Sequence, residues 1–181
     1  MKESGTKQIR TERLILRRFL LSDAEDAYRN WTLDERVARY VSWDIHKNVG
    51  ETEKLIQRWI ESYEDGSYNW VVQVAETEEI IGNISIIRFS REHNNCEIGY
   101  CYGSRFWNQG YATEALEAVL DYMLDECGMH VVEAKHYSLN PASGRVMEKA
   151  GMEKEAVLKD RRYDAAADTY CDLVCYCKMK M

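Results

Sequence analysis

The segment FWNQGYATEAL, residues 106–116, combines a glycine-containing turn with the start of a predicted helix. Helices usually begin after a Ser, Thr, Asp or Asn residue whose side chain accepts hydrogen bonds from the first backbone N–H groups. Here the nearest such residue is Asn108, and Gly110 directly precedes the helix. The first N–H groups and the positive end of the helix dipole would then be free to bind an anion such as a phosphate. The alternative is an ordinary connection that needs a flexible glycine.

This turn lacks the two most familiar phosphate-binding patterns. No Gly-Lys-Ser/Thr sequence follows it, which argues against a Walker A loop, and G-x-G-x-x-G is missing, which argues against a dinucleotide-binding fold. An anion would therefore have to be held by the backbone N–H groups of the turn and of the first helical residues.

Polar residues on neighbouring elements could complete a site beside this turn. Glu97 lies two residues before Gly99 in a predicted strand, so both positions face the same side of the sheet. A glycine inside a strand often marks a bulge or a close approach of a ligand to the backbone. Asn140 and Ser143 open another helix one strand later. Parallel pairing would place them near the same end of the sheet as the turn, where ligands of such sheets usually bind.

The elements that would position these residues follow from the periodicity of apolar residues, which is two in strands and 3.6 in helices. Predicted strands cover 11–19, 69–76, 80–89, 96–102, 130–138, 153–160 and 169–179. Predicted helices cover 22–31, 33–40, 51–66, 111–127 and 141–150. This order predicts an α+β fold, a mixed α/β sandwich with a mixed central sheet of about seven strands and helices on both faces.

Start signals and chain direction refine this outline. The segment 111–127 has the strongest helical pattern in the chain. Ser22 and Glu25 have the spacing of a capping box, and Asn140 is the expected N-cap of the last helix. The strand–helix–strand unit within 96–138 predicts a right-handed parallel crossover.

Length and composition indicate one globular domain over 1–181, with a core of about 9–178. The polar N-terminus shows no secretion signal, and no apolar run reaches the roughly 18 residues of a membrane span. We therefore expect a cytoplasmic protein without a membrane partner. The formal net charge of −7 argues against nucleic acid as the main partner and is compatible with a cationic substrate, although it is also ordinary for solubility.

The six cysteines predict reduced thiols, because the chain shows no secretion signal. Three of them lie in CDLVCYC, residues 171–177, which alternates like a buried strand. No C-x-x-C or paired histidine spacing accompanies them, so we expect no metal site.

Two motifs together resemble a known family. EIGYCYGSRFWNQGYATEAL, followed about thirty residues later by NPASGRVMEKAGM, is similar to the GNAT superfamily of N-acetyltransferases. The resemblance is closest to the RimJ/RimL-type branch, which includes ribosomal-protein N-terminal acetyltransferases, and TERLILRRF near the start also fits that branch. It covers roughly residues 9–178. It implies an N-acetyltransferase that moves an acetyl group from acetyl-CoA to a primary amine by direct attack in a ternary complex.

The match to the superfamily pattern Gln/Arg-x-x-Gly-x-Gly/Ala is partial. Gly110 and Ala112 agree with it, but Trp107 occupies the Gln/Arg position, as is common in the Rim-type branch. Asn108 stands where that branch often has glycine. Because backbone N–H groups would bind the pyrophosphate, these side-chain differences are compatible with binding.

The resemblance also implies roles for individual residues. Glu97 would be the general base for the amine, and the alternative is a structurally bonded strand carboxylate. Ser143 would protonate the leaving thiolate, and the alternative is a cap on its own helix. Tyr100, Tyr102 and Tyr111 are further candidates for the proton donor, although packing in the core or at the rim of the site is the favoured interpretation for each. The expected acetyl-CoA-binding residues are Ile98, Gly99, Tyr100, Asn108, Gln109, Gly110, Tyr111, Ala112, Thr113, Asn140 and Ser143.

The acceptor is less defined by the sequence. The helical segment 31–60 and the loops near 88–95 and 159–170 should form the walls of its pocket. Candidate acceptor contacts are Trp31, Trp43, Asp44, His46 and Tyr163. Aromatic and acidic residues would suit a cation, but the same residues also serve as packing. A protein N-terminus, a polyamine, an aminoglycoside or another small-molecule amine all remain open.

Two other functions remain open at this stage. One is a non-catalytic acyl-CoA-binding or regulatory module on the same fold, and the other is an interaction protein without a CoA site. The last strands could also pair with a second copy to form a homodimer.

Overall fold

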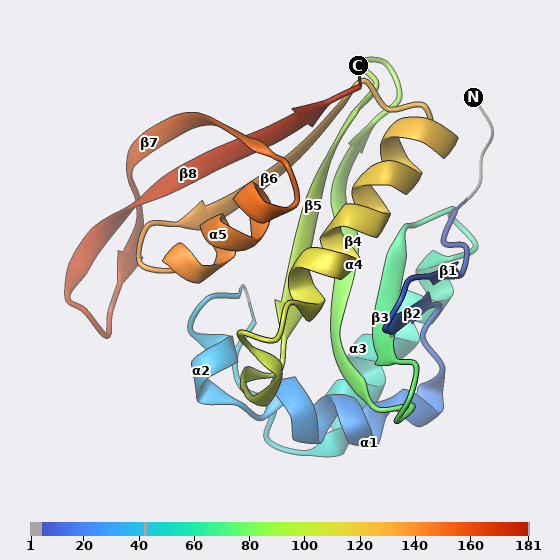
Figure 1. Cartoon of the computed structure of the whole chain (residues 1–181). Helices are drawn as coiled ribbons and strands as arrows, with labels where there is room; N and C mark the ends of the chain where they lie inside the picture. Colours follow the sequence, from blue (N-terminus) through green and yellow to red (C-terminus); the bar gives the residue numbers. More distant parts are fainter. Residues whose placement is uncertain (1–4, 42, 181) are drawn as a thin grey trace.

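A single mixed sheet of eight strands organises the chain (Figure 1). The structure is a computed structural model, and it describes residues 5–41 and 43–180. Across the sheet the strands follow the order β1-β2-β3-β4-β5-β6-β8-β7. Every neighbouring pair is antiparallel except β5 and β6, which are parallel. The predicted mixed sheet is therefore confirmed.

The strands match the segments with alternating apolar residues. Their bounds are β1 (Ile9–Arg10), β2 (Leu14–Arg17), β3 (Asn69–Val74), β4 (Ile80–Ser90), β5 (Asn95–Tyr102), β6 (Val131–Tyr137), β7 (Glu153–Asp164) and β8 (Thr169–Met179). The short β1 is the strand that the sequence analysis did not predict. The predicted strand 11–19 is shorter than expected, because Thr11 closes a turn onto Leu14: the Leu14 N–H donates to the Thr11 hydroxyl at 3.0 Å.

The helices also lie where the 3.6-residue period predicts them. Their bounds are α1 (Ala24–Ala27), α2 (Glu35–Ala38), α3 (Val49–Ser62), α4 (Tyr111–Asp121) and α5 (Pro141–Lys149). Two of them continue into π-helical turns, Tyr28–Thr32 after α1 and Tyr122–Glu126 after α4. The predicted helix 111–127 is thus α-helical only as far as Asp121.

One predicted helix cap is wrong, and another lacks its side-chain bond. Ser22 and Glu25 form no capping box, because the Asp23 carboxylate instead accepts a hydrogen bond from the Leu20 N–H at 2.8 Å. Asn140 is the N-cap residue of α5, as predicted, but its side chain makes no capping hydrogen bond. The amide of Asn140 is therefore left without the bond that the sequence predicted for it.

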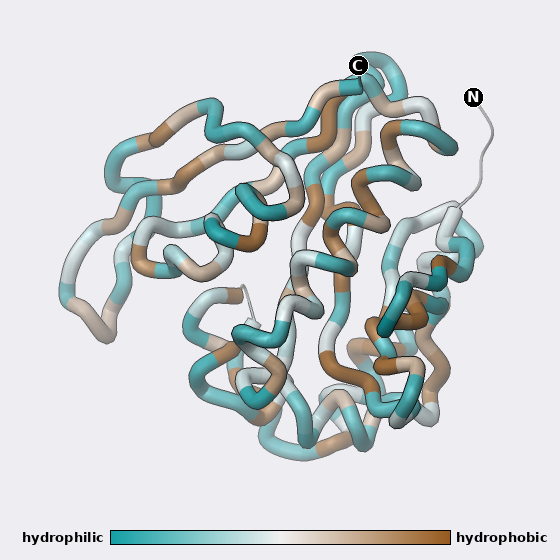
Figure 2. The backbone as a smooth tube through the Cα atoms, in the orientation of Figure 1, coloured by the Kyte–Doolittle hydropathy of each residue, from teal (hydrophilic) through white to brown (hydrophobic). Residues whose placement is uncertain are grey.

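Helices cover both faces of the sheet and create two cores. α4 and α5 pack on one face, where Leu116, Leu120 and Met147 meet Ile98 and Val132. α1, α2 and α3 pack on the other face in a smaller cluster, whose buried members are Phe19, Ala24, Ala27, Trp31, Val37, Ile56, Val71 and Ile80. Figure 2 shows hydrophobic residues gathered along the central strands. We call the two sides the α4/α5 face and the α1–α3 face.

The two parallel strands at the centre of the sheet diverge. β5 pairs with β6 only from Asn95 to Ile98, opposite 131–134, whereas β5 continues to pair with β4 as far as Tyr102. β6 continues along β8 as far as Tyr137. The edge of β5 that faces β6 is therefore unpaired from Gly99 onward, and the two strands separate toward their carboxyl ends (Figure 1).

The β7–β8 hairpin forms the outer edge of the sheet and curls away from it (Figure 1). Leu158 pairs with Leu173 and Arg162 pairs with Cys171, so four residue steps on β7 match two on β8. These two extra residues on β7 form a bulge. Pairing of the last strands with a second copy of the chain stays a prediction.

Candidate active site

The start of α4 is uncapped, as the sequence predicts. Gly110 occupies the N-cap position with φ of 83° and supplies no side chain to the helix. Asn108 also has a positive φ, 61°. Two left-handed residues so close together turn the backbone sharply before the helix. The first N–H groups of α4 are therefore available at the positive end of the helix dipole.

A polar network that the sequence analysis missed holds this turn in place. The Glu114 carboxylate accepts hydrogen bonds from the Thr11 hydroxyl at 2.6 Å, from the Arg13 N–H at 2.8 Å and from Arg13 Nε at 2.7 Å. Arg13 Nη1 in turn donates to the Gln109 carbonyl at 3.0 Å. Burial would raise the pKa of Glu114, but these hydrogen bonds outweigh it and lower the pKa overall. The network connects the β1–β2 turn to both sides of Gly110.

An open hollow of about 520 Å³ lies beside the same turn. It is lined by Glu12, Arg13, Gly110, Thr113, Glu114 and Glu117. The hollow gives a ligand at the start of α4 room to extend along the protein surface.

Glu97 lies on the α1–α3 face of β5, within a group of ion pairs. Its Oε2 atom accepts from Lys135 Nζ at 2.7 Å and from Arg88 Nε at 3.3 Å. Arg88 also reaches Glu133 Oε2 at 2.6 Å. Burial alone would lower the pKa of Lys135, but Glu97 and Glu133 raise it overall. Both cations bind one oxygen of Glu97, so the carboxylate is held in place with Oε1 outside these bonds.

The strand glycine has an immediate packing reason. A Cβ atom at Gly99 would lie 3.0 Å from Ile87 Cγ2. Ile87 lies at the irregularity where the β4–β5 register shifts between Ile86 and Arg88. A side chain at Gly99 would therefore require the exposed Ile87 to shift, while the edge of β5 that faces β6 is unpaired at the same residue.

Tyr100 and Ser143 meet on the opposite, α4/α5 face. The Tyr100 hydroxyl lies 2.9 Å from Ser143 Oγ and 3.1 Å from the Ser143 carbonyl oxygen. Burial raises the pKa of Tyr100 well above its usual range, so this phenol stays protonated. The partner of the Ser143 hydroxyl is therefore a strand tyrosine across the gap between β5 and α5.

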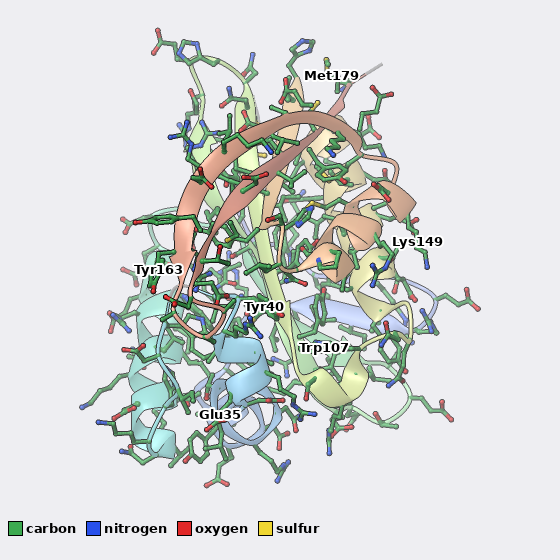
Figure 3. All side chains as sticks on the ribbon, turned by 90° about the vertical axis from the view of Figure 1, so that its left-hand side faces the viewer. Glu35, Tyr40, Trp107, Lys149, Tyr163 and Met179 are labelled. Carbon is green, nitrogen blue, oxygen red and sulfur yellow. The ribbon has the colours of Figure 1, made fainter. Side chains whose placement is uncertain are left out.

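The structure separates the residues predicted to contact the acceptor. Trp31 is only 1% exposed and belongs to the core of the α1–α3 face, so a ligand cannot reach it in this structure. Trp43 and His46 lie together, with ring centroids 5.5 Å apart, and Asp44 between them is exposed. Tyr163 is an exposed residue of the outer strand β7 (Figure 3), where its hydroxyl donates to Asp168.

His46 is fixed by a chain of buried hydroxyl groups. Its Nδ1 atom lies 2.8 Å from Thr52 Oγ1, which lies 2.8 Å from Thr32 Oγ1. Burial lowers the pKa of His46, and Arg58 adds to this while Glu51 opposes it. The loop that carries Trp43 and His46 is thereby attached to the start of α3.

Two contacts that the sequence did not indicate join α2 to the β7–β8 hairpin. Arg39, just after α2, pairs with Asp164 at 3.4 Å. Arg162 Nη2 donates to the Arg39 carbonyl at 3.0 Å. In Figure 3, Tyr40 lies where α2 approaches the hairpin. These contacts close one side of the α1–α3 face beside the diverging strands.

Two general properties concern metals and membranes. Within residues 5–41 and 43–180, no group of three His, Cys, Asp or Glu side chains is arranged to hold a metal ion. The six cysteines are free thiols. In the same part of the chain, no helix is long and apolar enough to cross a membrane.

A family comparison identifies this arrangement. Residues 13–153 match the family described as "Acetyltransferase (GNAT) domain". The chain belongs to the GNAT acetyltransferase family. Its function is therefore transfer of an acetyl group from acetyl-CoA to an amine nitrogen, and the resemblance stated from the sequence is confirmed.

Individual relatives agree with this assignment. The chain is 30% identical to the uncharacterized N-acetyltransferase YoaA of Bacillus subtilis (strain 168), over 86% of this chain and 88% of the relative. A GNAT-family acetyltransferase from Bacillus anthracis superposes with a TM-score of 0.84 at 27% identity, covering 96% and 99% of the two chains. The ribosomal L7/L12 alpha-N-protein acetyltransferase RimL, solved with coenzyme A, shares the fold with a TM-score of 0.82 at 20% identity, covering 96% and 98%.

Proposed function

We propose that this GNAT enzyme acetylates the primary amine of a small molecule or of a protein N-terminus at the point where β5 and β6 diverge. The uncapped start of α4 carries the proposal, because it offers an anion site beside that divergence. RimL, a fold neighbour, is described as a protein N-terminal acetyltransferase. The acceptor of this chain remains to be identified by experiment.

The chain's own groups fit the donor. The N–H groups of residues 108–113 would bind the pyrophosphate of acetyl-CoA, with Gly110 allowing the close backbone approach. The β6-facing edge of β5 has no strand partner from Gly99 onward and can bond the pantetheine arm instead. The Asn140 amide, which does not cap α5, can bond the same arm. Acetyl-CoA supplies the activated acyl group, and the chain positions it.

The acceptor amine must lose a proton before it can attack. A lysine-like amine has a pKa of about 10.4, so only about one molecule in a few thousand is neutral at pH 7. Glu97 is the proposed base, acting directly or through water. Lys135 and Arg88 hold Oε2, which leaves Oε1 to accept the proton.

The leaving sulfur must gain a proton as the amide nitrogen loses one. We assign this donation to the Ser143 hydroxyl, and the proton that the amide nitrogen releases replaces, through water, the one that Ser143 gives up. The buried Tyr100 phenol can donate to Ser143 Oγ at 2.9 Å, which leaves the Ser143 O–H free to point toward the sulfur. Tyr100 is thus a positioning residue, because it acts through Ser143.

The proposal is tested by measuring free-thiol release from acetyl-CoA with a panel of amines and N-terminal peptides. The wild-type protein should release thiol with one acceptor class, and Glu97→Gln should lower kcat/KM by about 10²–10⁴-fold, the usual contribution of a general base. Glu133→Gln, which changes a neighbouring carboxylate of the same ion-pair group, is the matched control and should retain most activity. Full activity of Glu97→Gln would remove Glu97 as the base.

A further inference from the structure

Several charged residues around the proposed acceptor site are paired with each other. Lys135 is bound to Glu97, and Arg88 is bound to Glu97 and Glu133. At the end of α2, Arg39 is bound to Asp164, whose pKa is lowered by the backbone N–H of Ala167 and by Arg39. Beyond the one amine that Glu97 would deprotonate, these paired acids offer little to the further cationic groups of a polycationic acceptor.

Arg162 is an exception among the charged residues around this site. Among the residues that the structure describes, no carboxylate pairs with it, and its guanidinium donates a hydrogen bond to the uncharged carbonyl of Arg39. Its guanidinium lies 4.7 Å from the ring centroid of Tyr137. A guanidinium has five N–H donors, and one bond leaves four for another partner.

The fold holds Arg162 in this position. The two-residue bulge in β7 lies directly before it, and Asp172 pins that bulge through Lys159 Nζ at 2.7 Å and the Asp160 N–H at 3.2 Å. The ring of Tyr137 supports one side of the guanidinium, and the side chain is half-buried. An arginine that is fixed before binding loses little entropy when it binds a planar anion.

Arg162 also lies on the correct face and near the reaction point. Tyr137 and Lys135 are two residues apart on β6, so both face the α1–α3 side, and Lys135 contacts Glu97. The two-residue step from Lys135 to Tyr137 spans about 7 Å along the strand. An acceptor whose amine reaches Glu97 could therefore place a second group, several bonds away, against Arg162.

We infer that Arg162 binds a carboxylate of the acceptor, so that the preferred substrates are primary amines that carry a carboxylate several bonds from the nitrogen. Arginine and a carboxylate form paired, charge-assisted hydrogen bonds. This inference rests on the proposed acetyl transfer and narrows its acceptor class, since it disfavours polyamines and aminoglycosides. Such a carboxylate could belong to an amino acid-like small molecule or to a peptide.

The test uses ω-amino acids of increasing chain length, each compared with its own carboxamide, together with short peptides with free and amidated C-termini. Wild-type kcat/KM should favour the acids by about tenfold or more, which is the discrimination expected for one charge-assisted pair. In Arg162→Gln this preference should fall to about one, mainly through a higher KM. Arg161→Gln, a change at the exposed neighbouring arginine, should keep the full preference for acids. Arg162→Lys should keep part of this preference.

A second measurement does not depend on turnover. With CoA present, the best acids of the series should raise the melting temperature of the wild type and of Arg161→Gln but not of Arg162→Gln. The melting temperatures of the wild type and Arg162→Gln without ligand show separately whether losing the contact with Arg39 destabilises the protein. Equal use of acids and amides by the wild type, an unchanged preference in Arg162→Gln, or no melting shift with any acid would each overturn the inference. Thiol release with uncharged amines alone would overturn it while leaving acetyl transfer intact.

Discussion

At the scale of single residues, the contact between Tyr100 and Ser143 gives the sharpest expectation. Tyr100→Phe removes the hydrogen-bond partner of the Ser143 hydroxyl, so kcat should fall about tenfold, the effect of losing one hydrogen bond of about 1.4 kcal/mol. Ser143→Ala should cost at least as much. Because Tyr100 acts through Ser143, the double variant should be no slower than Ser143→Ala, measured as thiol release at saturating acetyl-CoA. Multiplicative losses in the double variant would contradict this arrangement.

His46 gives a pH prediction at the same scale. Its pKa is lowered from 6.5, first by burial, so the folded state favours the neutral ring more than the unfolded state does. The stability that this provides is complete above pH 6.5 and is lost as the pH falls below 6.5 through the lower folded-state pKa. The melting temperature of the wild type should therefore fall more between pH 7.5 and 5.5 than that of His46→Gln. Parallel pH curves for the two proteins would show that His46 does not titrate in this way.

At the scale of elements, Glu114 joins the β1–β2 turn to the start of α4. Glu114→Gln keeps the size of the side chain but weakens three hydrogen bonds, to the Thr11 hydroxyl and to two groups of Arg13. Because the Arg13 side chain is 43% exposed, solvent screening reduces the loss, and we expect about 1–2 kcal/mol. The melting temperature should drop by about 3–6 °C, and the Kd for acetyl-CoA should rise because the Gln109 carbonyl loses its anchor. The control variant Glu117→Gln, in the same hollow, should change neither the melting temperature nor the Kd for acetyl-CoA. If Glu114→Gln had the same melting temperature and Kd as the wild type, the proposed role of this network would be contradicted.

The elements themselves could be predicted from sequence because each rests on local periodicity. The uncapped start of α4 was also visible, since the lack of a capping residue before Tyr111 is a local fact. The partners of Glu114 were not, because Thr11 and Arg13 lie about a hundred positions away and exposed polar residues carry no periodic signal. The fixed position of Arg162 depends on a strand bulge, which leaves little trace in an alternating pattern. Trp31 was misplaced because an aromatic residue serves a binding site or a core equally well in sequence.

At the scale of the whole molecule, we propose that the start of α4, the open edge of β5 and the α5 residues form one acetyl-CoA site on the GNAT fold. A ligand that binds only the folded state must stabilise it, by about 2.7 kcal/mol at a hundredfold excess over Kd. For a chain of this length that corresponds to a rise in melting temperature of about 5–10 °C.

The most direct test measures this rise for the wild type and for Gly110→Val. A β-branched side chain is strained at the φ of 83° found there, and it would displace the backbone N–H groups that we propose to bind the pyrophosphate. The account predicts a clear shift with acetyl-CoA for the wild type and a much smaller one for a folded Gly110→Val protein. No rise in the melting temperature of the wild type at saturating acetyl-CoA would contradict acetyl-CoA binding. An equal rise in both proteins would show that acetyl-CoA does not bind at the start of α4.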